Sequence, residues 1–138
     1  MIPESILIID DDEEFLATTL DFLVVQMNLN NVIWAKSSEE AEEKMKIYNP
    51  GVVILDLGMG KHKGEEISSI INNRPNSPII IMTSYYDFDD YLELTNELGG
   101  DGFFQKERLK TAFPKLMEYL NSEGYTRDIF HNKSYLLN

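Results

Sequence analysis

Five short runs of mostly apolar, often β-branched residues alternate with longer segments that have a helical repeat, and this alternation is what most constrains the fold. Most of the runs are nearly continuous, which is typical of strands covered on both faces. The segments between them have apolar residues at spacings of three and four, typical of helices with one apolar face. This order predicts an α/β protein with a doubly wound, five-stranded parallel sheet and helices on both faces. The runs are residues 5–9, 31–35, 51–55, 78–82 and 102–105.

Local signals indicate where some of the helices begin. Ser37 and Glu40 have the spacing of a capping box, which predicts a helix that starts after Ser37. Pro114 lies within the last apolar repeat, and proline inside a helix costs about 3 kcal/mol. We therefore expect the last helix to begin near 112–114, after a loop over 107–111. The first helix is expected to bury a stripe made of Leu16, Leu20, Leu23, Val24 and Met27.

Composition limits the class of protein. A chain of 138 residues is long enough for one domain with a single core, expected over residues 1–122, with 123–138 as a docked extension or truncated linker. The net charge of −12 argues against direct contact with nucleic acid, which requires a basic patch. No apolar run approaches the length of a membrane span, and the first residues lack the pattern of a secretory signal. With no cysteine present, we expect a cytoplasmic protein.

Residues with reactive side chains follow the predicted strands. The carboxyl ends of parallel strands meet at one edge of the sheet, where ligands bind in open α/β folds. We therefore expect these side chains to form one site. They are Asp10, Asp11 and Asp12 after the first run, Asp56 after the third, Thr83 and Ser84 after the fourth, and Lys106 after the fifth.

Such a site would suit phosphoryl transfer. Asp10, Asp11 and Asp56 would repel one another unless a cation neutralises them. Their hard oxygen ligands favour Mg²⁺, with Mn²⁺ as the alternative. A carboxylate beside the ion, with Lys106 and Thr83 opposite, could attack a phosphoryl group in line and become an aspartyl phosphate. Each residue alone has an ordinary explanation, such as a turn acid or a surface lysine, but the joint placement at four strand ends favours the phosphoryl site.

Four motifs together resemble the receiver domain of two-component response regulators, over about residues 4–122. The resemblance implies a flavodoxin-like (βα)5 fold with strand order 2-1-3-4-5. It also implies a phosphoprotein of signal transduction that is modified on an aspartate. The motifs are Ile6-Leu7-Ile8-Ile9-Asp10-Asp11-Asp12, Val53-Ile54-Leu55-Asp56-Leu57, Ile80-Ile81-Met82-Thr83-Ser84 and Gly99-Gly100-Asp101-Gly102-Phe103-Phe104-Gln105-Lys106.

The resemblance also assigns roles at the site. Asp56 is implied to be the phospho-acceptor, with Lys106 and Thr83 as its catalytic partners. Asp12 is expected only to start a helix. The implied metal ligands are Asp10, Asp11, Asp56 and the backbone carbonyl of Gly58.

A switch is implied as well. Thr83, Ser84 and Phe103 would couple phosphorylation to the surface formed by the fourth helix, the fifth strand and the fifth helix. Gly58 and Tyr85 fall at positions where the family tunes hydrolysis of the acyl phosphate.

The implied phosphodonor is a phosphohistidine on a histidine kinase or phosphotransfer protein, and the implied recipient of the signal is a downstream protein or output domain. The chain would not be an enzyme beyond its own phosphorylation and dephosphorylation. Opposite charges on the switch surface predict homodimerisation as one output, and two solvated faces are the equally weighted alternative. The acids are Asp87, Asp89, Asp90, Glu93 and Glu97, and the bases are Lys106, Arg108, Lys110 and Lys115.

Three other functions are compatible with parts of the pattern. A degenerate receiver would act only as a binding module, but the full set of acids, threonine and lysine argues against it. A small phosphatase with an aspartate nucleophile would use the Asp-x-Asp pattern in 10–12, yet the expected Gly/Thr-rich turn is missing. A flavin-binding domain of the same fold would need a phosphate-binding loop where the three acids stand.

Overall fold

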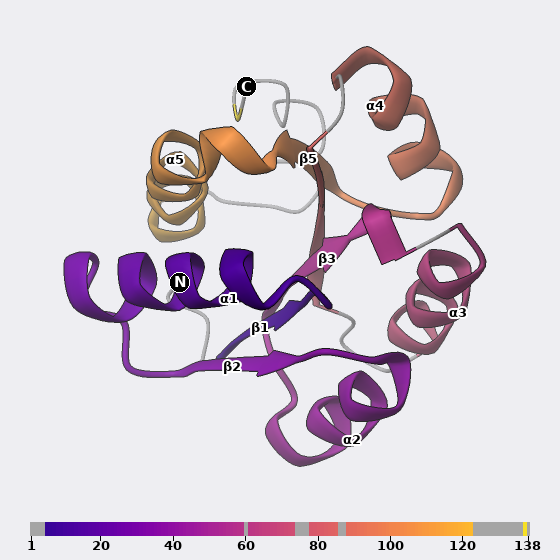
Figure 1. Ribbon diagram of the computed structural model, residues 1–138, viewed down its shortest axis with the longest axis horizontal. Helices are drawn as coiled ribbons and strands as arrows, with labels where there is room; N and C mark the ends of the chain where they lie inside the picture. Colours follow the sequence, from indigo (N-terminus) through magenta and orange to yellow (C-terminus); the bar gives the residue numbers. More distant parts are fainter. Residues whose placement is uncertain (1–4, 60, 74–77, 86–87, 123–136, 138) are drawn as a thin grey trace.

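The fold is a single five-stranded parallel sheet with helices on both faces, as predicted (Figure 1). The computed structural model describes residues 5–59, 61–73, 78–85, 88–122 and 137, and the side chains of all of these except 59, 61–64 and 88–92. The strand order is β2-β1-β3-β4-β5, which confirms the predicted order. The strands are β1 (Ile6–Ile9), β2 (Val32–Ala35), β3 (Val52–Asp56), β4 (Ile79–Ser84) and β5 (Gly102–Gln105).

The helices cover the two faces of the sheet and leave a hydrophobic cluster on each side. In Figure 1, α1 and α5 lie over one face, and α2, α3 and α4 lie over the other. Among the described residues, no helix is both long and apolar enough to cross a membrane. The α-helices are α1 (Glu13–Leu20), α2 (Ser38–Tyr48), α3 (Lys61–Asn72), α4 (Phe88–Glu97) and α5 (Leu109–Asn121), joined by a π-helical segment η1 (Asp21–Gln26) and the 3-10 turns η2 (Leu57–Met59) and η3 (Lys106–Arg108).

The central strands are buried along their whole length, which explains their continuous apolar runs. β3 and β4 extend further than predicted, so that Asp56, Thr83 and Ser84 are the last residues of strands rather than the first residues of loops. Because the backbone of these residues belongs to the sheet, the position of their side chains is set by strand pairing.

The second half of the first helical segment differs from the prediction. In η1 the amide of Met27 donates to the carbonyl of Phe22, five residues back, at 3.0 Å. This wider turn shifts the residues around the helix axis. As a result Phe22 and Leu23 are buried, whereas Val24, predicted to lie in the apolar stripe, is 44% exposed.

The start predicted for the second helix is confirmed. The hydroxyl of Ser37 accepts from the amide of Glu40 at 3.2 Å, and α2 begins at Ser38. In a standard capping box the Glu40 carboxylate would accept from the amide of Ser37. Here it accepts from the amide of Lys36, one residue earlier, at 2.9 Å.

The predicted start of the last helix is wrong. The structure has no loop over 107–111: η3 leads directly into α5, which begins at Leu109 and contains Pro114 in its second turn. Starting the helix early buries Leu109, Ala112 and Phe113 against the sheet. Burial of a leucine or phenylalanine side chain contributes about 1.5–3 kcal/mol each, which offsets the hydrogen bond that proline cannot donate.

Leu137 is the one residue described beyond position 122. It is 2% exposed and belongs to the hydrophobic cluster under α1 and α5. The rest of 123–138 lies outside the described residues, so the division between a domain over 1–122 and an extension stays a prediction.

Candidate functional site

Strand register brings the predicted site residues to one edge of the sheet. Ile9 pairs with Leu55, so Asp10 follows at the level of Asp56. Asp56 in turn pairs with Thr83 across β3 and β4. One strand further, Ser84 pairs with Gln105, and Lys106 comes next. The register therefore places the carboxyl ends of β1, β3, β4 and β5 side by side at one edge of the sheet.

A buried ion-pair network lies at this edge. The Nζ of Lys106 is 2.7 Å from Oδ2 of Asp10 and 3.2 Å from Oδ1 of Asp56. Asp10 is fully buried, and Asp56 and Lys106 are 3% and 5% exposed. Burying two carboxylates with one ammonium leaves a net negative charge in a poorly solvated place, which favours an added cation.

The carboxylate of Asp56 is held by the turn that follows it. The amide of Gly58, in η2, donates to Oδ1 of Asp56 at 2.8 Å. A Cβ atom on Gly58 would lie 3.0 Å from the same oxygen and 3.3 Å from Oδ2. A larger residue at position 58 would therefore crowd the Asp56 carboxylate, which would have to shift by a few tenths of an ångström.

Asp56 faces a small cavity of about 230 Å³. Asp11, Asp12 and Ser84 also line this cavity. The hydroxyl of Thr83 does not line it, because it is directed at the carbonyl of Leu55, 3.5 Å away. Its approach to Asp56 would require a change of rotamer.

The third residue of the predicted switch, Phe103, lies on the other side of the sheet from α5. It is buried in the cluster under α2, α3 and α4. The site therefore contains Asp10, Asp11, Asp56 and Lys106 directly, with Thr83 beside it and Phe103 one layer away.

Three carboxylates form a group that fits a divalent cation. Oxygen atoms of Asp10, Asp11 and Asp56 all lie within 4.8 Å of one another. Two of these residues are buried and Asp11 is exposed, so the group opens to solvent on one side. Carboxylate oxygens with an open side are the donor set that Mg²⁺ uses when it keeps part of its water shell.

Burial raises the pKa of Asp10 from 3.8 to about 6, because a charged carboxylate loses its water there. The Lys106 ammonium and the amide of Asp12 oppose this rise, and the charge of Asp56 adds to it. At neutral pH the metal-free domain therefore holds Asp10 ionised at a cost in folding free energy.

This cost predicts a pH dependence. In metal-free buffer, the folded protein binds a proton at Asp10 near pH 6, whereas the unfolded chain binds it near pH 3.8. The Asp10 contribution therefore raises the free energy of unfolding as pH falls from 8 to 5, and the full penalty above pH 6 is about 3 kcal/mol. In urea titrations with EDTA, Asp10→Asn should be more stable than wild type at pH 8, and this difference should shrink at pH 5. Asp21→Asn, an exposed control on η1, should follow wild type; a difference for Asp10→Asn that is independent of pH would contradict the prediction.

Two aromatic residues beside Lys106 were not among the predicted site residues as a pair. The Lys106 Nζ lies 4.6 Å from the ring centre of Phe15 and 4.7 Å from that of Tyr85. The Tyr85 hydroxyl donates to Oδ2 of Asp12 at 3.0 Å. Asp12 also starts α1 as predicted, since its Oδ1 accepts from the amides of Glu14 and Phe15. These bonds, led by that from Phe15, lower the pKa of Asp12, while burial and the Asp12 charge raise that of Tyr85 to about 12.

One predicted surface residue is misplaced. Lys106 was counted among the bases around the last helix, but it is buried in the site. The basic residues exposed near α5 are Arg108, Lys110 and Lys115.

The family model described as "Response regulator receiver domain" matches residues 6–121. The chain belongs to the response regulator receiver family. Receiver domains are signalling modules of two-component systems, which confirms the family expected from the motifs. Receiver domains bind Mg²⁺ at an acidic pocket, and this receiver has a group of three neighbouring carboxylates, Asp10, Asp11 and Asp56.

Known proteins show the same relationship. The receiver is 28% identical over 104 residues to "Transcriptional regulatory protein DegU" of Brevibacillus brevis, covering 75% of this chain and 44% of that protein. It is 30% identical over 119 residues to "Protein-glutamate methylesterase/protein-glutamine glutaminase 1" of Myxococcus xanthus, covering 86% of this chain and 34% of the relative. The chain thus spans less than half the length of these two relatives.

A solved structure agrees with the fold. The signal receiver domain of a DNA-binding response regulator protein from Colwellia psychrerythraea 34H superposes with a TM-score of 0.69 at 29% identity. The alignment covers 83% of this chain and 98% of that domain.

Proposed function

We propose that this receiver accepts a phosphoryl group on Asp56 from a phosphohistidine of a histidine kinase or phosphotransfer protein. An Asp56 oxygen attacks phosphorus, the phosphorus–nitrogen bond of the donor breaks, and the imidazole leaves with its electron pair. The observation that supports this proposal most is the position of the Lys106 ammonium, 3.2 Å from Asp56 and 2.7 Å from Asp10. There it would offset the charge that the phosphoryl oxygens bring to a buried site.

The surroundings of Asp56 favour attack by one of its two oxygens. The amide of Gly58 and the ammonium of Lys106 both contact Oδ1. These contacts hold the plane of the carboxylate, and we assign Oδ2 as the nucleophile. Asp10, Asp11, Asp56 and the carbonyl of Gly58 would hold Mg²⁺ or Mn²⁺. When bound, the ion would supply positive charge to the phosphoryl oxygens.

The change that follows phosphorylation would begin at Thr83. Its hydroxyl has only a long contact of 3.5 Å to the carbonyl of Leu55, so a phosphoryl oxygen could compete for it. Movement of Thr83 and Ser84 at the end of β4 would alter the packing of Phe103 on the neighbouring strand. A downstream protein or output domain would read the resulting surface.

The direct test is incubation with Mg²⁺ and acetyl phosphate, followed by intact mass spectrometry. We expect one phosphoryl group per chain, and none when EDTA removes the metal. A binding-only receiver would gain none under either condition. A phosphatase would instead release inorganic phosphate continuously without a stable adduct.

We also propose homodimerisation as one output of the surface charges, with two solvated faces as the equally weighted alternative. Glu93 and Glu97 of α4 are exposed, as are Arg108 and Lys110 before and in α5. The other predicted acids, at 87, 89 and 90, lie outside the described side chains. We expect the phosphorylated protein to elute as a dimer in low salt and as a monomer in high salt. A monomer in both would leave two solvated faces as the explanation.

Outside this self-modification we propose no enzymatic activity. The proposed location is the cytoplasm, where histidine kinases present their phosphohistidine.

A further inference from the structure

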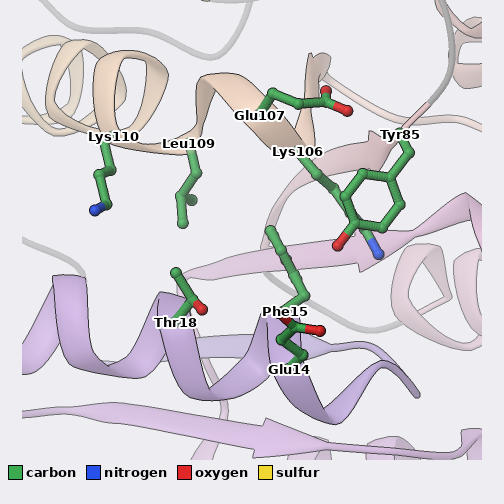
Figure 2. Close-up of a pocket in the computed structure, with 8 residues that line it drawn as sticks. All are labelled: Glu14, Phe15, Thr18, Tyr85, Lys106, Glu107, Leu109 and Lys110. Atoms are coloured by element: carbon green, nitrogen blue, oxygen red, sulfur yellow. The ribbon is translucent and has the colours of Figure 1, made fainter.

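Two aromatic rings lie close to the ammonium of Lys106 in addition to its carboxylate partners. Figure 2 shows Tyr85 next to the end of the Lys106 side chain, with Phe15 extending from α1 toward both. The ring centres lie 4.7 and 4.6 Å from Nζ, within the range of cation–π contacts. The two rings meet edge to face, with centres 6.3 Å apart and planes at 75°. We call this pair the aromatic clamp.

One carboxylate holds both members of the aromatic clamp. Oδ1 of Asp12 accepts from the backbone amide of Phe15 at 3.2 Å, which fixes the first turn of α1. Oδ2 of the same group accepts from the Tyr85 hydroxyl at 3.0 Å, which joins that turn to the end of β4. Asp12 is therefore more than a helix cap, because it connects elements that are 73 residues apart in the sequence.

Burial does not explain the position of Tyr85. Its side chain is 51% exposed, whereas Phe15 is 6% exposed and belongs to the core. A half-exposed tyrosine would sample several rotamers unless a specific contact retained it. The hydrogen bond to Asp12 and the contact with the ammonium are such contacts.

Two cavities meet at Tyr85 and Lys106. One is the cavity of about 230 Å³ in front of Asp56, and the other is a cleft of about 310 Å³ between α1 and the start of α5. Lys106 and Tyr85 line both of them. Without the ring of Tyr85, the lysine side chain could extend into the cleft, where Glu14 and Glu107 offer other carboxylates (Figure 2).

We propose that Phe15, Tyr85 and Asp12 are positioning residues that hold the Lys106 ammonium toward Asp10 and Asp56 and away from the neighbouring cleft. The positioning itself belongs to the unphosphorylated receiver. Its consequence for the rate of phosphorylation rests on the proposed function of Asp56. In both, the residues act through Lys106, and Asp12 and Tyr85 also line the cavity in front of Asp56.

The positioning can be measured without any phosphorylation. In protein with ¹³C-labelled lysine, ring currents from the clamp should move the Lys106 Hε signals upfield, with the assignment taken from Lys106→Met. Lys44 is an internal reference, because its Nζ lies 5.7 Å from the Trp34 ring and 5.8 Å from the Tyr48 ring, far from the site in the fold. Tyr85→Leu should move the Lys106 signals toward ordinary values and leave those of Lys44 unchanged. Unchanged Lys106 signals in Tyr85→Leu would overturn the proposal.

Two further variants separate the parts of the contact. Tyr85→Phe keeps the ring and loses the hydroxyl, so it should retain part of the upfield shift. Asp12→Ser keeps a helix cap but is too short to reach Tyr85, and it should resemble Tyr85→Phe. If Asp12→Ser leaves the signals as in wild type, Asp12 has no part in positioning.

The kinetic consequence is measured with acetyl phosphate and Mg²⁺ as initial rates of adduct formation. Tyr85→Leu should lower the maximal rate about tenfold, as expected for the loss of one cation–π contact to a buried ammonium. The half-saturating donor concentration should stay within about twofold, and Tyr85→Phe should recover part of the rate. A wild-type rate in Tyr85→Leu, together with a lost upfield shift, would overturn the kinetic consequence. Failure of wild type to form any adduct would overturn the proposed function, while the lysine signals would still decide the positioning.

Discussion

Asp56→Asn protein is expected to gain no phosphoryl group from acetyl phosphate and Mg²⁺, under conditions where wild type gains one. The amide keeps the shape of the side chain, and its oxygen can still accept from the amide of Gly58. It lacks the charged oxygen that would attack phosphorus, and it is a poorer ligand for a hard cation. The expected effect is complete loss, measured by intact mass after incubation long enough to saturate wild type.

A matched control makes this loss specific. Asp21→Asn removes an exposed aspartate on η1, away from the strand ends, and should be phosphorylated like wild type. An adduct that persists in Asp56→Asn and maps by peptide analysis to Asp10 or Asp11 would show that the acceptor is a neighbouring carboxylate. An adduct elsewhere would mean that the strand-end site is not the acceptor.

Lys106→Met is expected to slow phosphorylation of Asp56 by about 100- to 1000-fold, the usual cost of removing one group that stabilises transition-state charge. Methionine preserves most of the aliphatic volume between Phe15 and Tyr85 and removes the ammonium. Without it, Asp10 and Asp56 remain buried with no cationic side chain between them. The transition state then adds phosphoryl charge to a site that is already negative.

The control for this variant lies in the same cleft. Lys110 lines the cavity beside the aromatic clamp and is exposed, so Lys110→Met removes an equal charge about one helical turn away. It should stay within about twofold of wild type, because exposed charges act weakly through water. A rate for Lys106→Met within threefold of wild type would show that the buried ammonium is not needed for transfer.

Strand ends could be predicted from the sequence because the physics behind them is local. Continuous apolar runs indicate buried parallel strands, and the residues after such strands meet at one edge. Asp10, Asp56 and Lys106 follow from this reasoning. Their ion pairs do not, because distances of 2.7 and 3.2 Å depend on register and side-chain rotamers.

The contacts that Phe15 and Tyr85 make with Lys106 could not be predicted from the sequence, because these residues come from distant segments. Phe15 looks like one apolar residue of a helix stripe, and Tyr85 like one residue of a loop. Their meeting over Lys106 depends on the strand order and on Asp12 accepting bonds from both sides. Gly58 is similar, because its sequence position does not reveal the space that it leaves beside Asp56.

The predictions for the start of α5 and for the burial of Val24 were wrong for a different reason. Proline propensity predicted a late start for α5, but burial of Leu109 and Phe113 outweighed it. The wider turn of η1 shows no signal in composition and moves Val24 to the surface. In α5, tertiary packing overrode a local preference of about 3 kcal/mol.

The burial of Leu137 has a mechanical consequence. A free flexible segment of the length of 123–138 would let its far end wander over roughly 20 Å, so anything attached there would lose its orientation relative to the sheet. With Leu137 seated in the cluster beneath α1 and α5, that position instead travels with the domain as part of one body. A shift of α5 by a fraction of an ångström would then also move Leu137. A flexible segment would not transmit such a shift to its far end.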